Sequence, residues 1–271
     1  MSEEGVVFDS DGSTCSQTRA RVLAIVNQKG GVGKSTTAVN LSASLGDLGR
    51  KTLLIDLDPQ GNASSGYGLN RGQREQCIYD ALLGDVPLEQ LIEPVEVEHV
   101  FVVPATIQLA GAEIELVSAL SRENRLKNII EPVLGDFDFV IIDCPPSLGL
   151  LTINALTAAD GLIIPIQCEY YALEGLSKLL DSIRLVRSHL NGSLEVFGVV
   201  MTMFDVRTRL SQQVVDEVRE YFDDKVFKTL VPRSVRLSEA PSFGQPISLY
   251  DPSGKGAEAY RELAKEVVSR V

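Results

Sequence analysis

The sequence contains no tryptophan, and aromatic residues make up only 6% of its 271 residues. Its hydrophobic content of 44% therefore comes mainly from aliphatic side chains, which predicts an aliphatic core. A chain of this length and hydrophobic content can form one large α/β domain. The longest apolar runs, such as residues 139–142 and 162–166, are far shorter than the ~20 residues that a membrane-spanning helix needs.

Metal-binding residue types are also scarce. The chain has only two histidines, and none of its four cysteines shows CxxC spacing: Cys15, Cys77, Cys144 and Cys168. A zinc or iron–sulfur site is therefore not expected, and we interpret the cysteines as reduced thiols of a cytoplasmic protein. No apolar N-terminal stretch precedes a cleavage site, so no signal peptide is predicted.

Positive charge is in the minority, because 25 Lys and Arg residues face 37 Asp and Glu residues and the formal net charge is −12. This balance argues against a wholly basic nucleic-acid-binding protein, since binding to a phosphate backbone depends on positive charge. It leaves open a local basic patch, which would have to be compact and whose binding would depend on salt.

From Val22 onward, apolar runs typical of buried strands alternate with helical patterns. Continuous Val, Ile and Leu runs indicate strands buried on both faces, as in a parallel sheet covered by helices. We predict a doubly wound, three-layer α/β/α fold in one domain of residues 21–271, preceded by a disordered polar tail of residues 1–20. The predicted strands are 22–26, 51–56, 100–104, 137–143, 161–165 and 196–202, and the predicted helices are 37–48, 108–131, 148–158, 170–190, 208–222 and 255–271.

The segment KGGVGKST lies between the first predicted strand and the first predicted helix. A strand, a glycine loop, Lys-Ser/Thr and a helix in this order are typical of a phosphate-binding loop. Glycines let backbone amides approach phosphates, and the helix N-terminus adds partial positive charge. Lys34 is predicted to reach the β and γ phosphates, and Ser35 to ligate Mg²⁺. The predicted nucleotide-binding residues of this loop are Lys29, Gly30, Gly31, Val32, Gly33, Lys34, Ser35 and Thr36.

Acidic residues follow two other predicted strands, at the edge of the sheet where the loop is expected. Asp143 ends the strand 137–143, as in a Walker B motif, and is predicted to hold Mg²⁺ through water. Asp56 and Asp58 follow another strand, and alternation places both on the same side of an extended chain. Two carboxylates there suit a Mg²⁺–water site and a group that positions an attacking water.

The phosphate loop is atypical, because Gln28 stands where GxxxxGK[ST] has its first glycine and Lys29 adds a second lysine. This deviant Walker A motif resembles that of the P-loop ATPases that include ParA partitioning proteins, the MinD division-site protein and the nitrogenase iron protein. The resemblance to chromosomal, Soj-like ParA proteins implies a slow Mg²⁺-dependent ATPase that binds ATP and ADP. It covers residues 21–271 and is carried further by the segments 144–156, 170–176, 202–208, 231–242 and 251–252.

Several roles follow from this resemblance alone. It implies that Lys29 reaches across a homodimer interface to the partner's nucleotide, so that hydrolysis requires an ATP-bound dimer. In the segment DLDPQGN, it makes Asp56 the metal-side residue and Asp58 the catalytic residue that orients water, and it places Gln60 in the switch near the γ-phosphate. The residues that it places against adenine are Met203, Pro232 and Arg233.

The resemblance also implies a cytoplasmic, nucleoid-associated protein whose ATP dimer binds DNA without sequence preference. A ParB-type centromere-binding partner would stimulate hydrolysis and release the DNA. Such binding needs phosphate contacts from Lys and Arg. The candidates lie in two loops after late strands: Arg207, Arg209, Arg233 and Arg236, with Lys225 and Lys228 as weaker additions.

Two alternatives remain open. A MinD-like membrane-cycling regulator would bind liposomes, whereas the helix predicted at 255–271 mixes acidic and basic residues, has no Phe or Trp, and is predicted to pack on the sheet. A regulator that uses ATP only as a structural switch would be unaffected by Asp58→Ala. A cluster-binding role like that of the nitrogenase iron protein is not expected, because the Pro-Pro-Ser context of Cys144 does not match.

Overall fold

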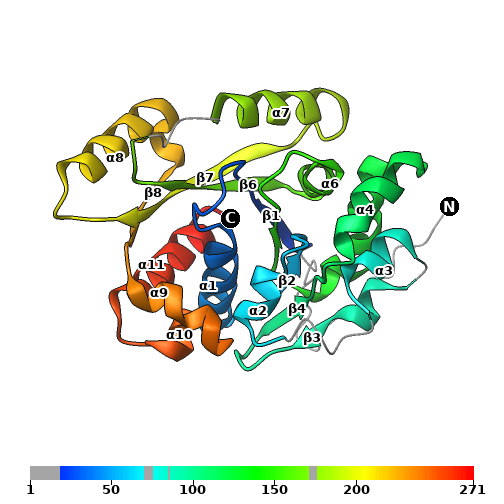
Figure 1. The fold of residues 1–271 in the computed structure, drawn as a ribbon, viewed down its shortest axis with the longest axis horizontal. Helices are drawn as coiled ribbons and strands as arrows, with labels where there is room; N and C mark the ends of the chain where they lie inside the picture. Colours follow the sequence, from blue (N-terminus) through cyan, green and yellow to red (C-terminus); the bar gives the residue numbers. More distant parts are fainter. Residues whose placement is uncertain (1–18, 70–75, 85, 171–175) are drawn as a thin grey trace, which may run out of the picture.

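The computed structural model describes residues 19–69, 76–84, 86–170 and 176–271. The described strands form one eight-stranded sheet with the order β3-β4-β2-β5-β1-β6-β7-β8. Every neighbouring pair is parallel except β3 and β4. Helices cover both faces of the sheet (Figure 1), which confirms the predicted doubly wound α/β/α fold.

Six of the eight strands correspond to predicted ones, whereas β3 and β8 were not predicted. The sequence of β8 mixes Lys228 and Thr229 with apolar residues, so it lacks a continuous apolar run. Glu266 of the last helix compensates by accepting the backbone N–H groups of Lys228 and Thr229, each at 2.8 Å. The strands are β1 (Arg21–Ile25), β2 (Thr52–Asp56), β3 (Glu93–Pro94), β4 (Val100–Val103), β5 (Phe139–Asp143), β6 (Gly161–Gln167), β7 (Glu195–Phe204) and β8 (Val226–Pro232).

The helices form two layers, each with its own buried apolar cluster. One layer contains α3 (Ile78–Leu83), α4 (Leu109–Glu115), α5 (Arg125–Ile130), α6 (Leu150–Ala158), α7 (Leu176–His189) and α8 (Arg209–Phe222). The other contains α1 (Lys34–Asp47), α2 (Asn62–Gly66), α9 (Val235–Glu239), α10 (Ile247–Tyr250) and α11 (Lys255–Ser269). Short 3-10 turns are η1 (Leu88–Leu91), η2 (Leu116–Ser118), η3 (Arg122–Asn124), η4 (Glu131–Asp136), η5 (Asp223–Lys225) and η6 (Ala240–Phe243).

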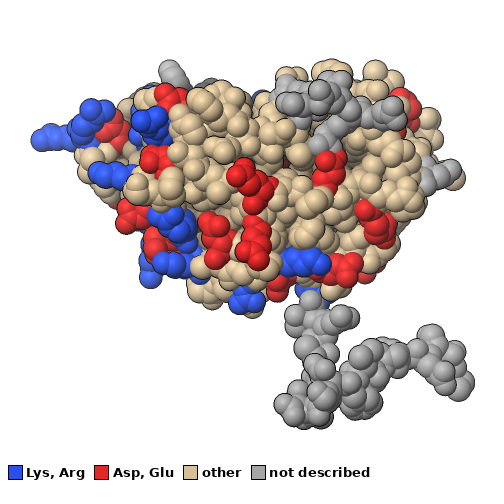
Figure 2. Space-filling view, turned by 90° about the horizontal axis from the view of Figure 1, so that it is seen from below, with Lys and Arg blue, Asp and Glu red and all other residues tan. Residues whose placement is uncertain are grey.

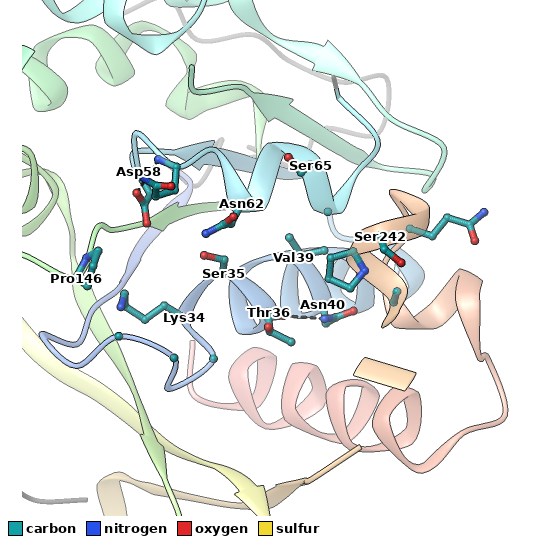
Figure 3. A pocket seen from close by; sticks show the side chains of 18 of the residues that line it. Lys34, Ser35, Thr36, Val39, Asn40, Asp58, Asn62, Ser65, Pro146 and Ser242 are labelled. Atoms are coloured by element: carbon teal, nitrogen blue, oxygen red, sulfur yellow. Dashed lines mark hydrogen bonds between the residues drawn. The ribbon is translucent and has the colours of Figure 1, made fainter. Parts of the chain in front are cut away.

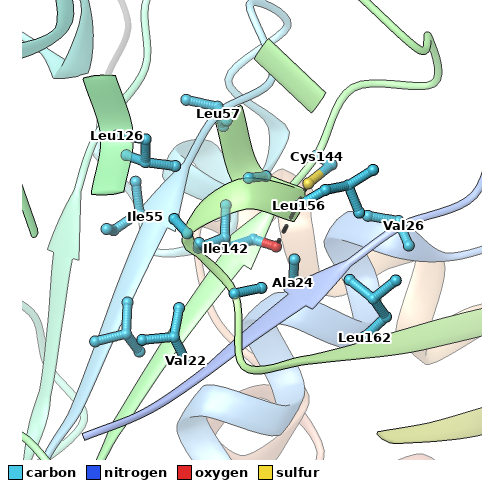
Figure 4. Packing of buried hydrophobic residues seen from close by; sticks show 14 of the residues in the cluster. Val22, Ala24, Val26, Ile55, Leu57, Leu126, Ile142, Cys144, Leu156 and Leu162 are labelled. Carbon is cyan, nitrogen blue, oxygen red and sulfur yellow. Dashed lines mark hydrogen bonds between the residues drawn. The ribbon is translucent and has the colours of Figure 1, made fainter. Parts of the chain in front are cut away.

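The central strand β1 shows how one sheet supplies both clusters. Val22 and Ala24 belong to one cluster, whereas Leu23 and Ile25 belong to the other, as expected when successive side chains point to opposite faces. Figure 4 shows Val22 and Ala24 among aliphatic side chains from neighbouring strands, with Leu156 of α6 above them. The core is aliphatic on both sides, as the composition predicts.

The predicted helix 108–131 is wrong as a continuous element. It is divided into α4, η2, η3 and α5, and Ser121 at the break has a left-handed φ of 50°. Asn154 of α6 stabilises the break, because its Oδ1 accepts the N–H of Leu126 (3.0 Å) and its Nδ2 donates to the carbonyl of Arg122 (2.8 Å). A tertiary contact therefore overrides the local helical pattern.

The structure describes the C-terminal end of the chain through Val271, but the N-terminal end only from Arg19. Residues 1–18 of the predicted tail lie outside the described residues, whereas Arg19 and Ala20 are part of the fold: Ala20 is buried and donates to the carbonyl of Leu134 (2.9 Å). The predicted helix 170–190 is described from Leu176 onward, as α7. The last helix, α11, packs against α1 and β8 with its apolar face buried, which confirms that prediction.

Candidate nucleotide-binding site

The phosphate loop connects β1 to α1 at the carboxyl edge of the sheet, where the crossovers after β1 and β5 run to opposite sides. Gly31 and Gly33 have φ values of 75° and 91°, conformations that disfavour residues with a side chain. Thr202 of β7 donates a hydrogen bond from Oγ1 to the carbonyl of Val32 (2.8 Å). The glycines and this bond shape a loop that leads directly into the N-terminus of a helix, the geometry that favours bound anions.

Lys34 is the first residue of α1 and is almost fully buried in the loop, with 7% of its surface exposed. Its Nζ donates a hydrogen bond to the carbonyl of Lys29 (3.2 Å). Burial lowers the pKa of Lys34, and the negative charges of Asp143 and Asp58 oppose that shift. A cation held between a phosphate loop and two carboxylates is placed to contact the terminal phosphates of a nucleotide.

Asp56 and Asp143 end the neighbouring strands β2 and β5 and face each other in the parallel register. Both are fully buried. Burial raises the pKa of Asp56 to about 6. Burial also raises the pKa of Asp143 well above its usual range, and the nearby charge of Asp56 adds to that rise. Two carboxylates at this depth repel each other when both are ionised, and a bound cation would relieve the repulsion.

Asp143 lacks the partners that would normally accompany a buried carboxylate. Neither of its oxygens forms a hydrogen bond within the described part of the chain. Buried polar atoms are rarely unpaired in folded proteins, so these oxygens are suited to a further ligand. Ser35 lies close enough for its hydroxyl to oppose the rise in the pKa of Asp143. A carboxylate and a hydroxyl beside a phosphate loop are the oxygen ligands that Mg²⁺ prefers, so these residues fit that ion.

Asp56, in contrast, accepts three hydrogen bonds from the protein. Its Oδ2 accepts the N–H (2.7 Å) and the hydroxyl (2.6 Å) of Ser64, and its Oδ1 accepts the N–H of Asp58 (3.1 Å). Asp58 is 5% exposed, and its Oδ1 accepts the N–H of Gln60 (2.9 Å). The segment DLDPQGN is therefore a folded turn whose two aspartates are each held by backbone amides.

An open cleft of about 560 Å³ is lined by Lys34, Ser35 and Asp58, whereas the fully buried Asp56 and Asp143 are not among its described lining residues. Figure 3 shows Lys34, Ser35, Asp58 and Pro146 toward one end of it, and Asn40 and Ser242 toward the other. Its walls come from the phosphate loop, the α2 region, Met203 and the segment that contains η6. Its lining residues are Gly30, Gly31, Gly33, Lys34, Ser35, Thr36, Val39, Asn40, Asp58, Gln60, Asn62, Ser65, Gly66, Pro146, Met203, Ala240, Pro241, Ser242 and Gln245.

A second hollow of about 290 Å³ adjoins the first and shares Gly33, Thr36, Met203 and Pro241 with it. It also contains Pro232 and Arg233, so the three residues predicted to lie against adenine occur together on its wall: Met203, Pro232 and Arg233. Met203 has a left-handed φ of 53°, an unusual conformation for a residue with a side chain.

Lys29 is placed differently from the rest of the loop. Its carbonyl accepts the bond from Lys34, but its partly exposed side chain is not among the described residues that line the two hollows. Gln60, the predicted switch residue, does line the larger cleft. Within one copy of the chain, Gln60 thus lines the cleft, whereas the Lys29 side chain does not.

The arginines predicted to contact DNA are exposed on the surface, but most are paired with carboxylates. Arg207 forms two bonds to Asp205, at 2.9 and 2.7 Å. Only Arg209 has no such partner among the described residues. In Figure 2, basic side chains gather toward the left end of the face, where α8 and α9 lie in Figure 1, and acidic side chains alternate with them. The other pairs are Arg233–Glu169 (2.9 Å) and Arg236–Glu239 (3.2 Å).

Among the described residues there is neither a cluster of metal-binding side chains nor a helix that could span a membrane. No three His, Cys, Asp or Glu side chains there are grouped so that they could hold a metal ion. A Mg²⁺ ion at Asp143 would therefore take most of its ligands from phosphate and water. Cys144 is fully buried in the core (Figure 4). No helix in the same ranges is long and apolar enough to cross a bilayer.

Three polar residues that support the site were not predicted from the sequence. Ser64 binds Asp56, Thr202 holds the loop, and Asn40 links α1 to the far wall by accepting the N–H of Ile247 (2.6 Å). The short helix α2, which carries Ser64, was not predicted either. The available signal was the run of small polar residues directly after DPQGN, which is typical of a tightly turned segment.

Comparison with known proteins agrees with this geometry. The family model described as an AAA domain matches residues 20–196. The chain is similar to the structure described as cobyrinic acid a,c-diamide synthase from Mycobacterium smegmatis with bound ADP and magnesium, with a TM-score of 0.82, 38% identity, and coverage of 92% of this chain and 94% of that one. It also resembles MinD complexed with Mg-ADP from Pyrococcus horikoshii, with a TM-score of 0.73, 26% identity, and coverage of 92% and 96%.

Sequence relatives are more similar still. The chain is 60% identical over 249 residues to the sporulation initiation inhibitor protein Soj of Bacillus subtilis, which covers 92% of this chain and 98% of that protein. It is 55% identical over 253 residues to the chromosome partitioning protein ParA of Myxococcus xanthus, which covers 93% of this chain and 89% of that protein. A further relative, from Treponema pallidum, is 52% identical and is named a chromosome-partitioning ATPase. The chain belongs to the Soj/ParA family of chromosome-partitioning ATPases.

Proposed function

We propose that this chain binds Mg²⁺-ATP in the larger cleft and hydrolyses it as a switch that controls dimerisation and DNA binding. The observation that carries the proposal is the buried carboxylate of Asp143, whose oxygens form no hydrogen bond within the described residues and which lies within electrostatic reach of Lys34 and Ser35. Ser35 and Asp143 would hold Mg²⁺, with Asp56 contributing through a water because most of its acceptor capacity is used within the protein. The ion would neutralise charge on the phosphates.

The chain's own residues would supply positioning rather than covalent chemistry. Lys34 would contact the terminal phosphates, and Asp58 would orient a water in line with the γ-phosphorus. That water forms the new P–O bond as the bond to the ADP oxygen breaks. The adjoining hollow would take the base between Met203 and the Pro232-Arg233 turn.

Dimerisation is the second part of the proposal. Lys29 contributes its carbonyl to its own loop, while its side chain stays outside the two hollows. A lysine placed in this way is free to reach the nucleotide of a second copy. Lys29→Ala keeps the carbonyl, so it should preserve nucleotide binding while hydrolysis falls in the dimer.

DNA binding and release complete the cycle. The ATP dimer would bind DNA without sequence preference through Arg207, Arg209, Arg233 and Arg236, which places the protein in the cytoplasm on the nucleoid. A ParB-type partner would stimulate hydrolysis and release it. The exposed ion pairs of these arginines are weak, so phosphates can replace the carboxylates.

The deciding experiment measures DNA binding by the purified protein with ATP, with ADP and without nucleotide. Asp58→Ala should retain ATP-dependent binding, and Arg236→Glu should abolish DNA binding while nucleotide binding stays intact. Arg184→Glu is the matched control, because Arg184 is also exposed and also pairs with a carboxylate three residues away, but on α7. If no nucleotide state binds DNA, the DNA role is wrong, and liposomes and protein partners become the next test.

A further inference from the structure

Ser64 lies at the centre of a line of buried hydrogen-bonded groups that leads to Asp58, the proposed catalytic residue. Its side chain is completely buried, and its hydroxyl donates to Asp56 Oδ2 at 2.6 Å. The same hydroxyl oxygen accepts the backbone N–H of Ala105 at 3.0 Å. A serine hydroxyl has one donor and two acceptor positions, so the donor is fully committed to Asp56.

The line continues from Asp56 to the water-orienting aspartate. Asp56 Oδ1 accepts the N–H of Asp58 (3.1 Å), and Asp58 Oδ1 accepts the N–H of Gln60 (2.9 Å). The orientation of Asp56 therefore fixes the backbone of Asp58, and the backbone fixes where that carboxylate points. A rotation of Asp56 would break the bond to Asp58 N–H and loosen the turn.

The opposite end of the line is anchored outside the loop. Ala105 directly follows β4 and Pro104, and its N–H is the donor to Ser64. Ser64 thus joins the end of β4, the end of β2 and helix α2 through one hydroxyl. Charge-assisted bonds to a carboxylate are shorter and stronger than neutral ones, and a buried network of this kind holds its members in one geometry.

We propose that Ser64 is a positioning residue for ATP hydrolysis, which acts through Asp56 to hold Asp58 in its working geometry. This inference rests on the proposed hydrolytic role of Asp58. It distinguishes the two aspartates, because both carboxylate oxygens of Asp56 accept hydrogen bonds from the protein, whereas neither carboxylate oxygen of Asp143 accepts one from the described residues. Ser64 is not among the described residues that line the cleft, so its effect on hydrolysis is indirect.

The test compares Ser64→Ala, Ser64→Cys and Ser64→Thr in the full chain. Supporting groups one step removed from a reacting centre typically contribute about 10–100-fold. Single-turnover hydrolysis of Mg²⁺-ATP should fall by about that factor in Ser64→Ala and Ser64→Cys, while the Kd for nucleotide changes less than about threefold. Ser64→Thr keeps the hydroxyl and should recover most of the rate.

A matched control separates positioning from general loss of stability. Ser42→Ala also removes a buried hydroxyl, one that is bonded to Tyr67 and to the carbonyls of Ala38 and Val39 in α1 and that does not itself line the cleft. It should lower Tm by an amount similar to Ser64→Ala and leave the hydrolysis rate unchanged. Equal hydrolysis by Ser64→Ala and the unmodified chain would overturn the proposal, as would a loss of nucleotide affinity that accounts for the whole rate effect.

Hydrogen exchange provides a readout that does not depend on hydrolysis. Peptides that contain the amides of Asp58 and Gln60 should exchange faster in Ser64→Ala than in the unmodified chain or in Ser42→Ala. If the unmodified chain does not hydrolyse ATP, the proposed function fails, and the exchange comparison still decides whether Ser64 holds Asp58. Unchanged exchange in Ser64→Ala would refute the positioning role by itself.

Discussion

Asp143→Asn should stabilise the nucleotide-free protein and remove its response to Mg²⁺. Asparagine keeps the shape of the side chain but removes its charge. No hydrogen bond within the described residues is lost, because neither carboxylate oxygen has one. The substitution also ends the repulsion with Asp56, which lies opposite Asp143 on the neighbouring strand. Replacement of the Asp143 carboxylate should therefore raise the free energy of unfolding of the nucleotide-free protein.

The size of the effect follows from burial. An unsatisfied buried polar group costs about 1–3 kcal/mol, and more when it is charged. In a chain of this size, about 1 kcal/mol moves Tm by about 2–4 °C. We therefore expect Asp143→Asn to raise Tm by about 2–12 °C at neutral pH without nucleotide.

The pH dependence has a definite sign. Because the pKa of Asp143 is raised in the folded state, the folded protein binds this proton more tightly than the unfolded chain. The loss of stability caused by ionised Asp143 is absent below the ordinary pKa of an aspartate, and it grows as the pH rises toward the pKa of Asp143 in the folded protein. The advantage in Tm of Asp143→Asn should accordingly shrink as the pH is lowered toward 4.

Asp56→Asn is the control, because it changes the same residue type at the same depth in the next strand. Asp56 accepts three hydrogen bonds, and an amide that turns its NH₂ toward these donors loses at least one of them, so its Tm should fall. Thermal unfolding scans from pH 4 to 8, with and without Mg²⁺-ADP, measure both variants. A lower Tm for Asp143→Asn, or a Mg²⁺-dependent stabilisation equal to that of the unmodified chain, would refute the assignment.

Three further predictions concern the walls of the cleft. Gly244→Ala should lower Tm by more than Gly49→Ala. Both glycines have positive φ, but of the two only Gly244 is so close to other backbone that a new Cβ would lie 2.6 Å from Gly68 Cα. Thermal scans of the two variants test this. Lys34→Met should abolish nucleotide binding in calorimetric titrations, since the cleft loses the cation that is placed to contact the phosphates. Thr202→Val should weaken nucleotide binding about fivefold, the equivalent of one hydrogen bond of about 1 kcal/mol, and an unchanged Kd would show that the bond to Val32 does not shape the loop.

The sequence predicts the sheet more accurately than it predicts the helices around it. Strands such as β5 are continuous apolar runs, and a strand buried on both faces has few alternatives. The segment 108–131 has an apolar pattern typical of a helix, but its break depends on Asn154, which is distant in the chain. The edge strand β8 depends on Glu266 in the same way. Such contacts cannot be inferred from local periodicity.

The candidate site, like the fold, can be predicted only in part from the sequence. The residue types of the phosphate loop and the carboxylates at the strand ends are evident in the sequence, since each follows an apolar run. The sequence does not predict how many hydrogen bonds the carboxylates of Asp56 and Asp143 each accept. The carboxylate of Asp56 accepts three hydrogen bonds from Ser64 and Asp58, whereas neither carboxylate oxygen of Asp143 accepts one from the described residues. That difference depends on the short helix α2, whose five residues carry no periodic signal of their own.

The ion pairs of the surface arginines predict how DNA binding should depend on ATP and on salt. Arg207, Arg233 and Arg236 are exposed and each pairs with a carboxylate, so a phosphate that binds them must displace Asp205, Glu169 or Glu239. Exposed pairs of this kind contribute about 0–1 kcal/mol each, so the exchange is feasible but adds little affinity per copy. Given a net charge of −12, a single copy should bind DNA weakly, and only the doubled patch of a dimer should compete with salt. DNA binding by this chain should therefore require ATP and fall steeply with ionic strength.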